Sequence, residues 1–137
     1  MTTDDKYCPN FTSLSSIDYK ISLVENLARH NKLSAISELN DRLRKNGKGG
    51  MWLATASISS LPPHDLRQVL EAVIGFDDFN ADNDPHGEHD CATQSVGNLK
   101  IIWKIDYYDR AREFLSPDPS DPKVTLRVLT VMLASEY

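Results

Sequence analysis

Six carboxylates and two histidines crowd into residues 76–90, which read FDDFNADNDPHGEHD and contain no lysine or arginine. Proline, glycine and asparagine interrupt any apolar period in this stretch, so we expect a loop. Carboxylate and imidazole groups can transfer protons, bind metal ions or face a positively charged partner. The acids are Asp77, Asp78, Asp82, Asp84, Glu88 and Asp90, and the histidines are His86 and His89.

A β-hairpin is predicted directly after this loop. Residues 97–98, Gly-Asn, form a two-residue turn signal, and apolar residues then occupy every second position over residues 99–107. Because the turn sets the pairing of the two strands, we expect Cys91 to face Lys104.

Continuing the same pairing outward places His89 opposite Asp106, with Cβ atoms about 5 Å apart. His89 could then serve as a general base with Asp106 fixing its tautomer, and the histidine could also activate the thiol of Cys91. The alternative is structural, a cross-strand ion pair or hydrogen bond that closes the hairpin. Both interpretations depend on the register, because a shift of one residue moves each side chain to the other face.

A divalent metal ion is a further possibility in the loop. Asp84, His86 and His89 supply the imidazole and carboxylate ligands that suit zinc, manganese or iron. Residues 78–84 carry oxygen ligands at alternate positions, as in a calcium-binding loop, but His89 stands where that loop needs a bidentate glutamate. The structural alternative is that these carboxylates accept hydrogen bonds from the loop backbone.

The charge of the chain is distributed unevenly. Its 137 residues carry a formal net charge of -5. Residues 1–50 hold eight Lys/Arg against six Asp/Glu, whereas residues 51–137 hold seven against fourteen. Direct nucleic-acid binding is therefore disfavoured, because phosphate contacts need clustered positive charge. The basic residues between positions 42 and 48 are expected on a solvated helix end, where cations suit the helix dipole.

Targeting signals are not evident in the sequence. No apolar run approaches the ~20 residues that cross a bilayer, and the polar N-terminus does not resemble a secretory signal. Two cysteines are too few for a disulfide framework. We therefore expect a cytoplasmic protein without a membrane partner.

The elements before the loop predict the first part of an α+β domain. Residues 1–14 are expected to be a flexible leader, and residues 15–137 a single domain. One or two helices should come first, with Gly47 as a C-terminal stop. A strand over residues 51–58 and a helix over residues 63–74 then follow.

The elements after the loop predict a small antiparallel sheet. Hairpin 88–107 is expected to pack on helix 63–74. Residues 124–133 are ambiguous between strand and helix, and their β-branched residues favour a strand. The residues expected in the core are Trp52, Leu99, Ile101, Trp103 and Ile105 from the sheet, and Leu66, Val69, Leu70 and Val73 from the helix.

Three sequence blocks carry a resemblance to a known family. They are residues 83–90 (NDPHGEHD), residues 103–109 (WKIDYYD) and residues 127–137 (RVLTVMLASEY). Together they resemble a small bacterial family of unknown function, over roughly residues 35–137. Members of that family are often encoded on plasmids, phages and integrated elements, and an aromatic residue is usual where this chain has Cys91. The resemblance implies a mobile genetic element as context and no particular reaction.

Two functions follow as hypotheses. The first is a non-enzymatic acidic interaction protein without a cofactor, which binds a basic surface on a partner protein. By analogy with other small acidic proteins of mobile elements, the partner would be a host defence nuclease or complex, such as CRISPR–Cas. The residues expected to contact it are Asp77, Asp78, Asp82, Asp84, Glu88, Asp90 and Asp109.

The second hypothesis is a small hydrolase. His89 would be its general base and Asp106 would orient it. Alternatively, the hydrolase would be metal-dependent, with a divalent metal ion held by Asp84, His86 and His89 as its cofactor.

Overall fold

The computed structural model describes the backbone of residues 14–137 and the side chains from Lys20 onward. The leader expected over residues 1–14 lies outside the described residues except for Leu14, which begins helix α1 (Leu14–Asn46). The chain divides into two compact units, residues 1–32 and residues 33–137, and each is described by itself. The single domain expected over residues 15–137 stays a prediction.

In the first unit, the described residues belong to the beginning of α1. Every side chain from Lys20 to Lys32 is exposed. Four of them are large apolar side chains with about half or more of their surface in solvent: Ile21 at 51%, Leu23 at 48%, Val24 at 67% and Leu27 at 60%. This stretch of helix therefore presents an apolar face that no part of its own unit covers among the described residues.

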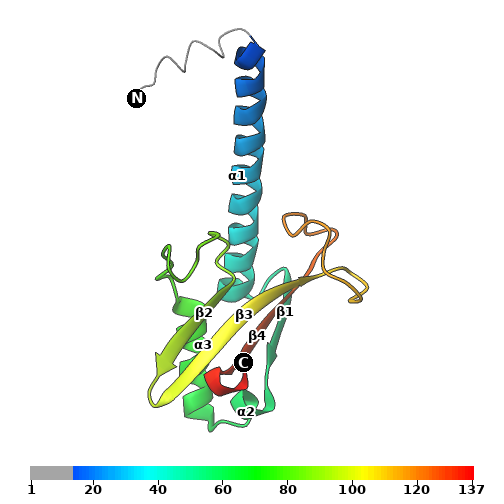
Figure 1. Ribbon diagram of the computed structural model, residues 1–137. Helices are drawn as coiled ribbons and strands as arrows, with labels where there is room; N and C mark the ends of the chain where they lie inside the picture. The colour runs from blue at the N-terminus through cyan, green and yellow to red at the C-terminus, as the bar shows by residue number, and fades with distance from the viewer. Residues whose placement is uncertain (1–13) are drawn as a thin grey trace. The chain divides into compact units, whose positions relative to one another are not determined.

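The second unit contains the rest of α1 and all other elements (Figure 1). They are β1 (Gly50–Ala54), α2 (Ala56–Ser59), α3 (Pro63–Gly75), β2 (Cys91–Val96), β3 (Leu99–Tyr108), β4 (Leu126–Leu133) and the 3-10 helix η2 (Ala134–Glu136). The predicted α+β class is confirmed. The helix predicted over residues 63–74 and the strand favoured over residues 124–133 are also confirmed.

The four strands form one sheet in the order β1-β4-β3-β2. The pairs β2–β3 and β3–β4 are antiparallel, as expected, but β1 runs parallel to β4, so the sheet is mixed. Gly50 begins β1 where the two backbones come close. A Cβ at that position would clash with the carbonyl oxygen of Arg127, so only glycine permits this parallel pair.

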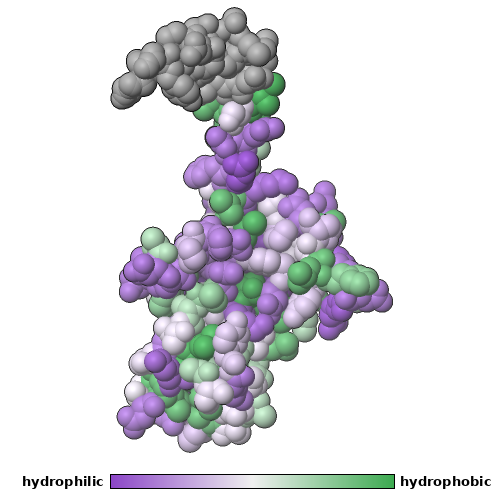
Figure 2. Space-filling view, in the orientation of Figure 1, coloured by the Kyte–Doolittle hydropathy of each residue, from purple (hydrophilic) through white to green (hydrophobic). Residues whose placement is uncertain are grey.

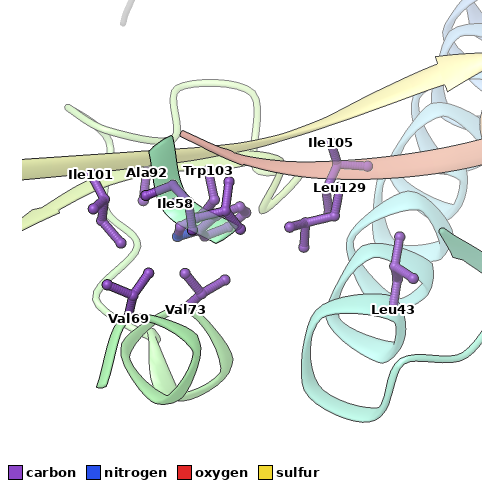
Figure 3. Packing of buried hydrophobic residues seen from close by; sticks show 10 residues of the cluster. Leu43, Ile58, Val69, Val73, Ala92, Ile101, Trp103, Ile105 and Leu129 are labelled. Atoms are coloured by element: carbon purple, nitrogen blue, oxygen red, sulfur yellow. The ribbon is translucent and has the colours of Figure 1, made fainter. Parts of the chain in front are cut away.

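The hairpin turn has the predicted register. Gly97 has a φ of +60°, which glycine adopts without strain, and Cys91 pairs with Lys104. Ile101, Trp103 and Ile105 of β3 are at most 4% exposed and face the helices. Figure 3 shows α3 and the end of α1 on the same side of the sheet, where Val69, Val73 and Leu43 point toward these strands.

One local prediction is corrected by the fold, and another is made more specific. The strand expected over residues 51–58 ends at Ala54, and α2 follows, because Ile58 turns back into the core, fully buried. One or two N-terminal helices were expected, and the structure has a single one, α1. It ends at the predicted stop, where the N–H of Gly47 donates to the carbonyl oxygen of Leu43. Among the described residues, no helix is both long and apolar enough to cross a bilayer.

Candidate functional site

His89 contacts both α1 and the loop of residues 76–90. Its Nδ1 lies 3.0 Å from both carboxylate oxygens of Asp41. Its ring stacks on Phe79, with a centroid distance of 4.0 Å and an interplanar angle of 2°. Its Nε2 lies 3.7 Å from Oδ2 of Asp84. The imidazole is therefore held by two carboxylates and an aromatic ring, with 31% of its side chain exposed.

Asp84 organises the end of the loop from inside. Its side chain is 5% exposed and accepts hydrogen bonds from the backbone N–H groups of Glu88 and His89, at 3.1 and 3.2 Å. These bonds satisfy buried donors at a point where the chain turns, and His89 takes a φ of +57° there. Asp84 thus positions both Glu88 and His89.

Arg44 connects α1 to α3 and to the aromatic residues. It is 1% exposed, donates to the carbonyl oxygens of Val73 and Ile74 at the end of α3, and pairs with Asp41 at 3.1 Å. Its guanidinium lies 5.1 Å from the centroid of the Trp103 ring, a cation–π arrangement. The sequence placed this arginine on a solvated helix end; the structure corrects that, because the side chain turns into the core to bind the α3 carbonyls.

A second set of buried polar groups centres on Asn40, which is fully buried. Its Nδ2 donates to the carbonyl oxygen of Glu88 at 3.0 Å and to the hydroxyl of Tyr107 at 2.8 Å. Its Oδ1 accepts from Nε of Arg127 at 2.9 Å. The Tyr107 hydroxyl in turn donates to the Glu88 carboxylate at 2.7 Å. Because Glu88 also bonds to Asp84, the two sets join into one.

We call this set the inner polar network: Asn40, Asp41, Arg44, Asp84, Glu88, His89, Tyr107 and Arg127. Burial raises the pKa of Tyr107, with the Glu88 carboxylate as the next contribution, so the tyrosine stays a neutral donor. Burial lowers the pKa of Arg127, whose guanidinium lies 5.3 Å from the Tyr107 ring centroid. Nε of Arg44 is buried without a hydrogen-bond partner, and the other hydrogen bonds of the network link the helix, loop and sheet in one arrangement.

The first half of the loop behaves differently. We call Asp77, Asp78 and Asp82 the outer acidic edge. All three are exposed, and among the described residues none of their carboxylates has a hydrogen bond or ion pair. Figure 2 shows this loop as a largely hydrophilic projection beside the sheet. The seven acids expected at a partner surface are therefore not equivalent.

Backbone contacts hold the outer acidic edge in place. The side chain of Asn80 accepts from the N–H groups of Asp82 and Asn83, at 2.9 and 3.1 Å. Asn83 accepts from the Asn80 N–H at 2.9 Å and donates to the Asp78 carbonyl at 2.8 Å. These are the local turn bonds that asparagine makes well.

Asp90 and Asp109, the remaining predicted contact residues, are half-buried. The Asp90 backbone accepts from the N–H of Ile105, while Asp109 accepts from the N–H of Glu113 at 2.9 Å. Figure 1 shows the loop after β3, which contains Asp109, on the other side of the sheet from the loop of residues 76–90. Asp109 is thus not part of the outer acidic edge.

The structure does not bring His89 and Asp106 together. The hairpin pairing continues outward to the bond between Asp90 and Ile105, at 2.7 Å, and then stops. At His89 the positive φ turns the chain out of the ladder, because Asp84 takes its N–H and Asp41 its ring. Asp106 lies on the face away from the core, paired with Lys104.

The three proposed metal ligands do not form a site within the described residues, although Nε2 of His89 lies 3.7 Å from Oδ2 of Asp84. His86 is exposed, whereas Asp84 is buried and accepts backbone hydrogen bonds. Within the part of the chain with described side chains, no three His, Cys, Asp or Glu residues could hold a metal ion together. Cys91 shares a hollow with Lys104 and Tyr137 on the outer face of the sheet. Burial and the nearby Asp90 raise the pKa of its thiol, which disfavours a nucleophilic thiolate.

Sequence reasoning missed four members of the inner polar network: Asn40, Asp41, Arg44 and Arg127. A signal was present for three of them. Asn40 and Arg44 continue the helical spacing of the buried residues Ile36 and Leu43, and Arg127 alternates with the buried Leu129 and Val131. A polar residue at a core position of a periodic pattern indicates a buried partner.

The fold and the network define a small α+β protein in which buried polar groups tie a helix and an acidic loop to a mixed sheet. Residues 54–136 match the family described as Protein of unknown function (DUF3768). Since this covers more than half of the chain, the chain belongs to that family. Searches among curated proteins and solved structures gave no match. The resemblance to a family of unknown function is confirmed, and the mobile-element context stays a prediction.

Proposed function

We propose that this protein is a non-enzymatic binding protein whose outer acidic edge contacts a basic surface on a partner protein. One observation supports it above the others. Asp77, Asp78 and Asp82 point into solvent without partners among the described residues, from a loop that contains no Lys or Arg. Carboxylates of one sign grouped in this way complement a positive surface and accelerate encounter with it.

The stiffness of the loop supports the same proposal. Asn80 and Asn83 bond to the backbone on both sides of Asp82, so the backbone that carries the carboxylates is already held before a partner arrives. Less conformational entropy is then lost on binding. The proposal accordingly narrows the seven acids expected from the sequence to the three at the outer acidic edge.

His89 has a structural part in this proposal. A general base needs one free ring nitrogen within reach of a substrate. Nδ1 of His89 bonds to Asp41, and Nε2 faces the carboxylate of Asp84 at 3.7 Å. The bond to Asp41 favours a histidine that joins the loop to α1, and the binding protein that we propose needs neither a cofactor nor a hydrolytic reaction.

The class of partner follows from the resemblance to proteins of mobile elements. Nucleic-acid-binding defence complexes, including CRISPR–Cas effectors, have basic grooves, and a rigid group of carboxylates could occupy such a groove in place of phosphate. A purified effector complex is thus the first partner to test. A cytoplasmic location would be consistent with that role.

The experiment is a pulldown from host lysate followed by affinity measurement on each retained partner. The test variant replaces Asp77, Asp78 and Asp82 together by Asn. It should lose the partners or raise their Kd by about tenfold, because three complementary charges are removed. The affinity of the unaltered protein should also fall as salt is raised.

The control removes the same amount of charge elsewhere. Glu38, Glu71 and Glu113 are exposed and lie outside the loop, so their replacement by Gln should leave binding unchanged. If the Asn variant retains every partner, or if both variants weaken binding equally, the outer acidic edge is not the contact surface.

A further inference from the structure

The apolar side chains exposed on the first part of α1 follow a seven-residue repeat. Ile21 and Ala28 are seven residues apart, and Val24 comes three residues after the first and four before the second. This is the spacing of a coiled-coil heptad in which Ile21 and Ala28 take position a and Val24 takes position d. The helix backbone extends back to Leu14, so the same repeat assigns residues 14 and 17, a leucine and an isoleucine, to a and d. Asn31 ends the apolar series.

This stretch is helical without packing inside its own unit. All residues from Lys20 to Lys32 are exposed, and a helix of this length is only marginally stable in water when its apolar face stays uncovered. Figure 2 shows hydrophobic patches among hydrophilic ones along the exposed helix. Lys20, Ile21, Val24 and Glu25 line a shallow hollow in this face. In the heptad they are g, a, d and e, the positions that line the seam of a two-stranded coiled coil.

Charge indicates what covers the face. In a parallel, in-register pair, a g residue faces the e residue five positions later on the other helix. Lys20 is at g and Glu25 is at e, so the two copies would place opposite charges together on both sides of the seam. Leu27 takes the next g position and would extend the apolar surface toward the partner helix. In the single chain it is 60% exposed.

We propose that two copies of this chain associate through residues 14–28 of α1 as a parallel coiled coil. The occupant of the apolar face is a second copy, because the heptad and the g–e charges are self-complementary in one register. The seam spans about two heptads, so the dimer is weak and forms with rising protein concentration. The inference is independent of the outer acidic edge, which lies in the other unit.

Sedimentation velocity over a range of concentrations tests the association with the full chain. The unaltered protein should pass from monomer to dimer as its concentration rises. Ile21→Glu with Val24→Glu puts four charges into the seam of the dimer and should raise its dissociation constant by about 100-fold or more. Ser22→Glu with Asn26→Glu adds the same charge on the opposite face and should leave dimerisation unchanged.

Charge reversal tests the register. Lys20→Glu should raise the dissociation constant by about threefold or more, because it places like charges at both g–e contacts. Adding Glu25→Lys to that variant restores opposite charges and should return the constant to its original value. Failure of the second change to restore dimerisation contradicts the proposed pairing.

Crosslinking tests the direction of the helices. In a background with Cys8→Ser and Cys91→Ser, Ile21→Cys and Ala28→Cys are made separately and oxidised. A parallel pair forms disulfide-linked dimers at both positions, whereas an antiparallel pair can form them at one position at most. A protein that stays monomeric at every concentration overturns the proposal. The proposal is also overturned if the variant with Ile21→Glu and Val24→Glu dimerises normally. It is overturned as well if that variant differs from the unaltered protein only in losing binding to anionic lipid vesicles, since the apolar face would then contact a membrane.

Discussion

The two halves of the loop at residues 76–90 contain three acids each, and these acids have different physical roles. Asp77, Asp78 and Asp82 lie in solvent, whereas Asp84 and Glu88 accept hydrogen bonds from buried or half-buried groups. A buried carboxylate is retained only when donors or positive charges satisfy it. The acids of the second half are therefore buried or half-buried, whereas the three acids of the first half are exposed.

The comparison shows why counting acids overestimates a binding surface. Net charge describes the field around a molecule, but each carboxylate contributes to recognition only if it is exposed and unpaired. In this loop, half of the acids already have partners in the chain or are partly withdrawn from solvent. Mutations in the two halves should consequently change different properties, stability in one and binding in the other.

The largest expected effect is on the inner polar network. Arg127→Met leaves Asn40 and the Pro119 carbonyl without their donor in a buried site. We expect a loss of about 3 kcal/mol in the free energy of unfolding, measured by urea denaturation. Lys123→Met, an exposed change in the preceding loop, serves as the control and should stay within about 0.5 kcal/mol. Equal losses would mean that the network does not hold this unit together.

A smaller effect separates the two halves of the loop directly. Asp84→Ala removes the acceptor of two backbone N–H groups, those of Glu88 and His89, and should destabilise the fold by about 2 kcal/mol. Asp82→Ala, two residues away, should change stability by less than about 0.5 kcal/mol. The measurement is again denaturant unfolding, with the two variants side by side. A destabilising Asp82→Ala would erase the distinction between the halves.

The smallest effect concerns Asp90, whose carboxyl is half-buried. Burial, and next the nearby Glu88, raise the pKa of Asp90 above its ordinary range. Such a group binds its proton more tightly in the folded state, so stability falls as pH rises from the unfolded pKa to the folded pKa. Asp90→Asn should remove this fall and make the protein slightly more stable at neutral pH.

Unfolding measured at a series of pH values between about 3 and 7 checks this sign. The control is Asp77→Asn at the outer acidic edge, which should keep the pH dependence of the unaltered protein. If Asp90→Asn instead destabilises the protein at neutral pH and leaves the slope unchanged, the Asp90 carboxylate is favourably bound in the folded state.

Much of the fold could be predicted because its signals are local. The turn at residues 97–98 set the register of β2 and β3, proline and apolar spacing located α3, and glycine marked the end of α1. The register even predicted the pairing at Cys91 and Lys104. It failed two residues further out, at His89, because contacts with Asp41 and Asp84 outweigh one more step of the ladder.

The candidate site was harder to predict, since its members come from distant parts of the chain. Asn40 meets Glu88, Tyr107 and Arg127 across separations of 48 to 87 residues. No local pattern pairs a helix residue with a strand so far along the sequence. Periodicity alone could only have shown that Asn40, Arg44 and Arg127 occupy core positions.

By itself, the sequence determined most of the elements of this protein, the register of its hairpin and the place where its acids gather, because propensity, turn chemistry and period act over a few residues. Tertiary structure decided which of those acids face outward, which carboxylates hold His89, and that β1 runs parallel to β4. Those outcomes depend on burial and on partners brought together by folding, and a carboxylate buried among donors stabilises the fold while an exposed one remains free to bind.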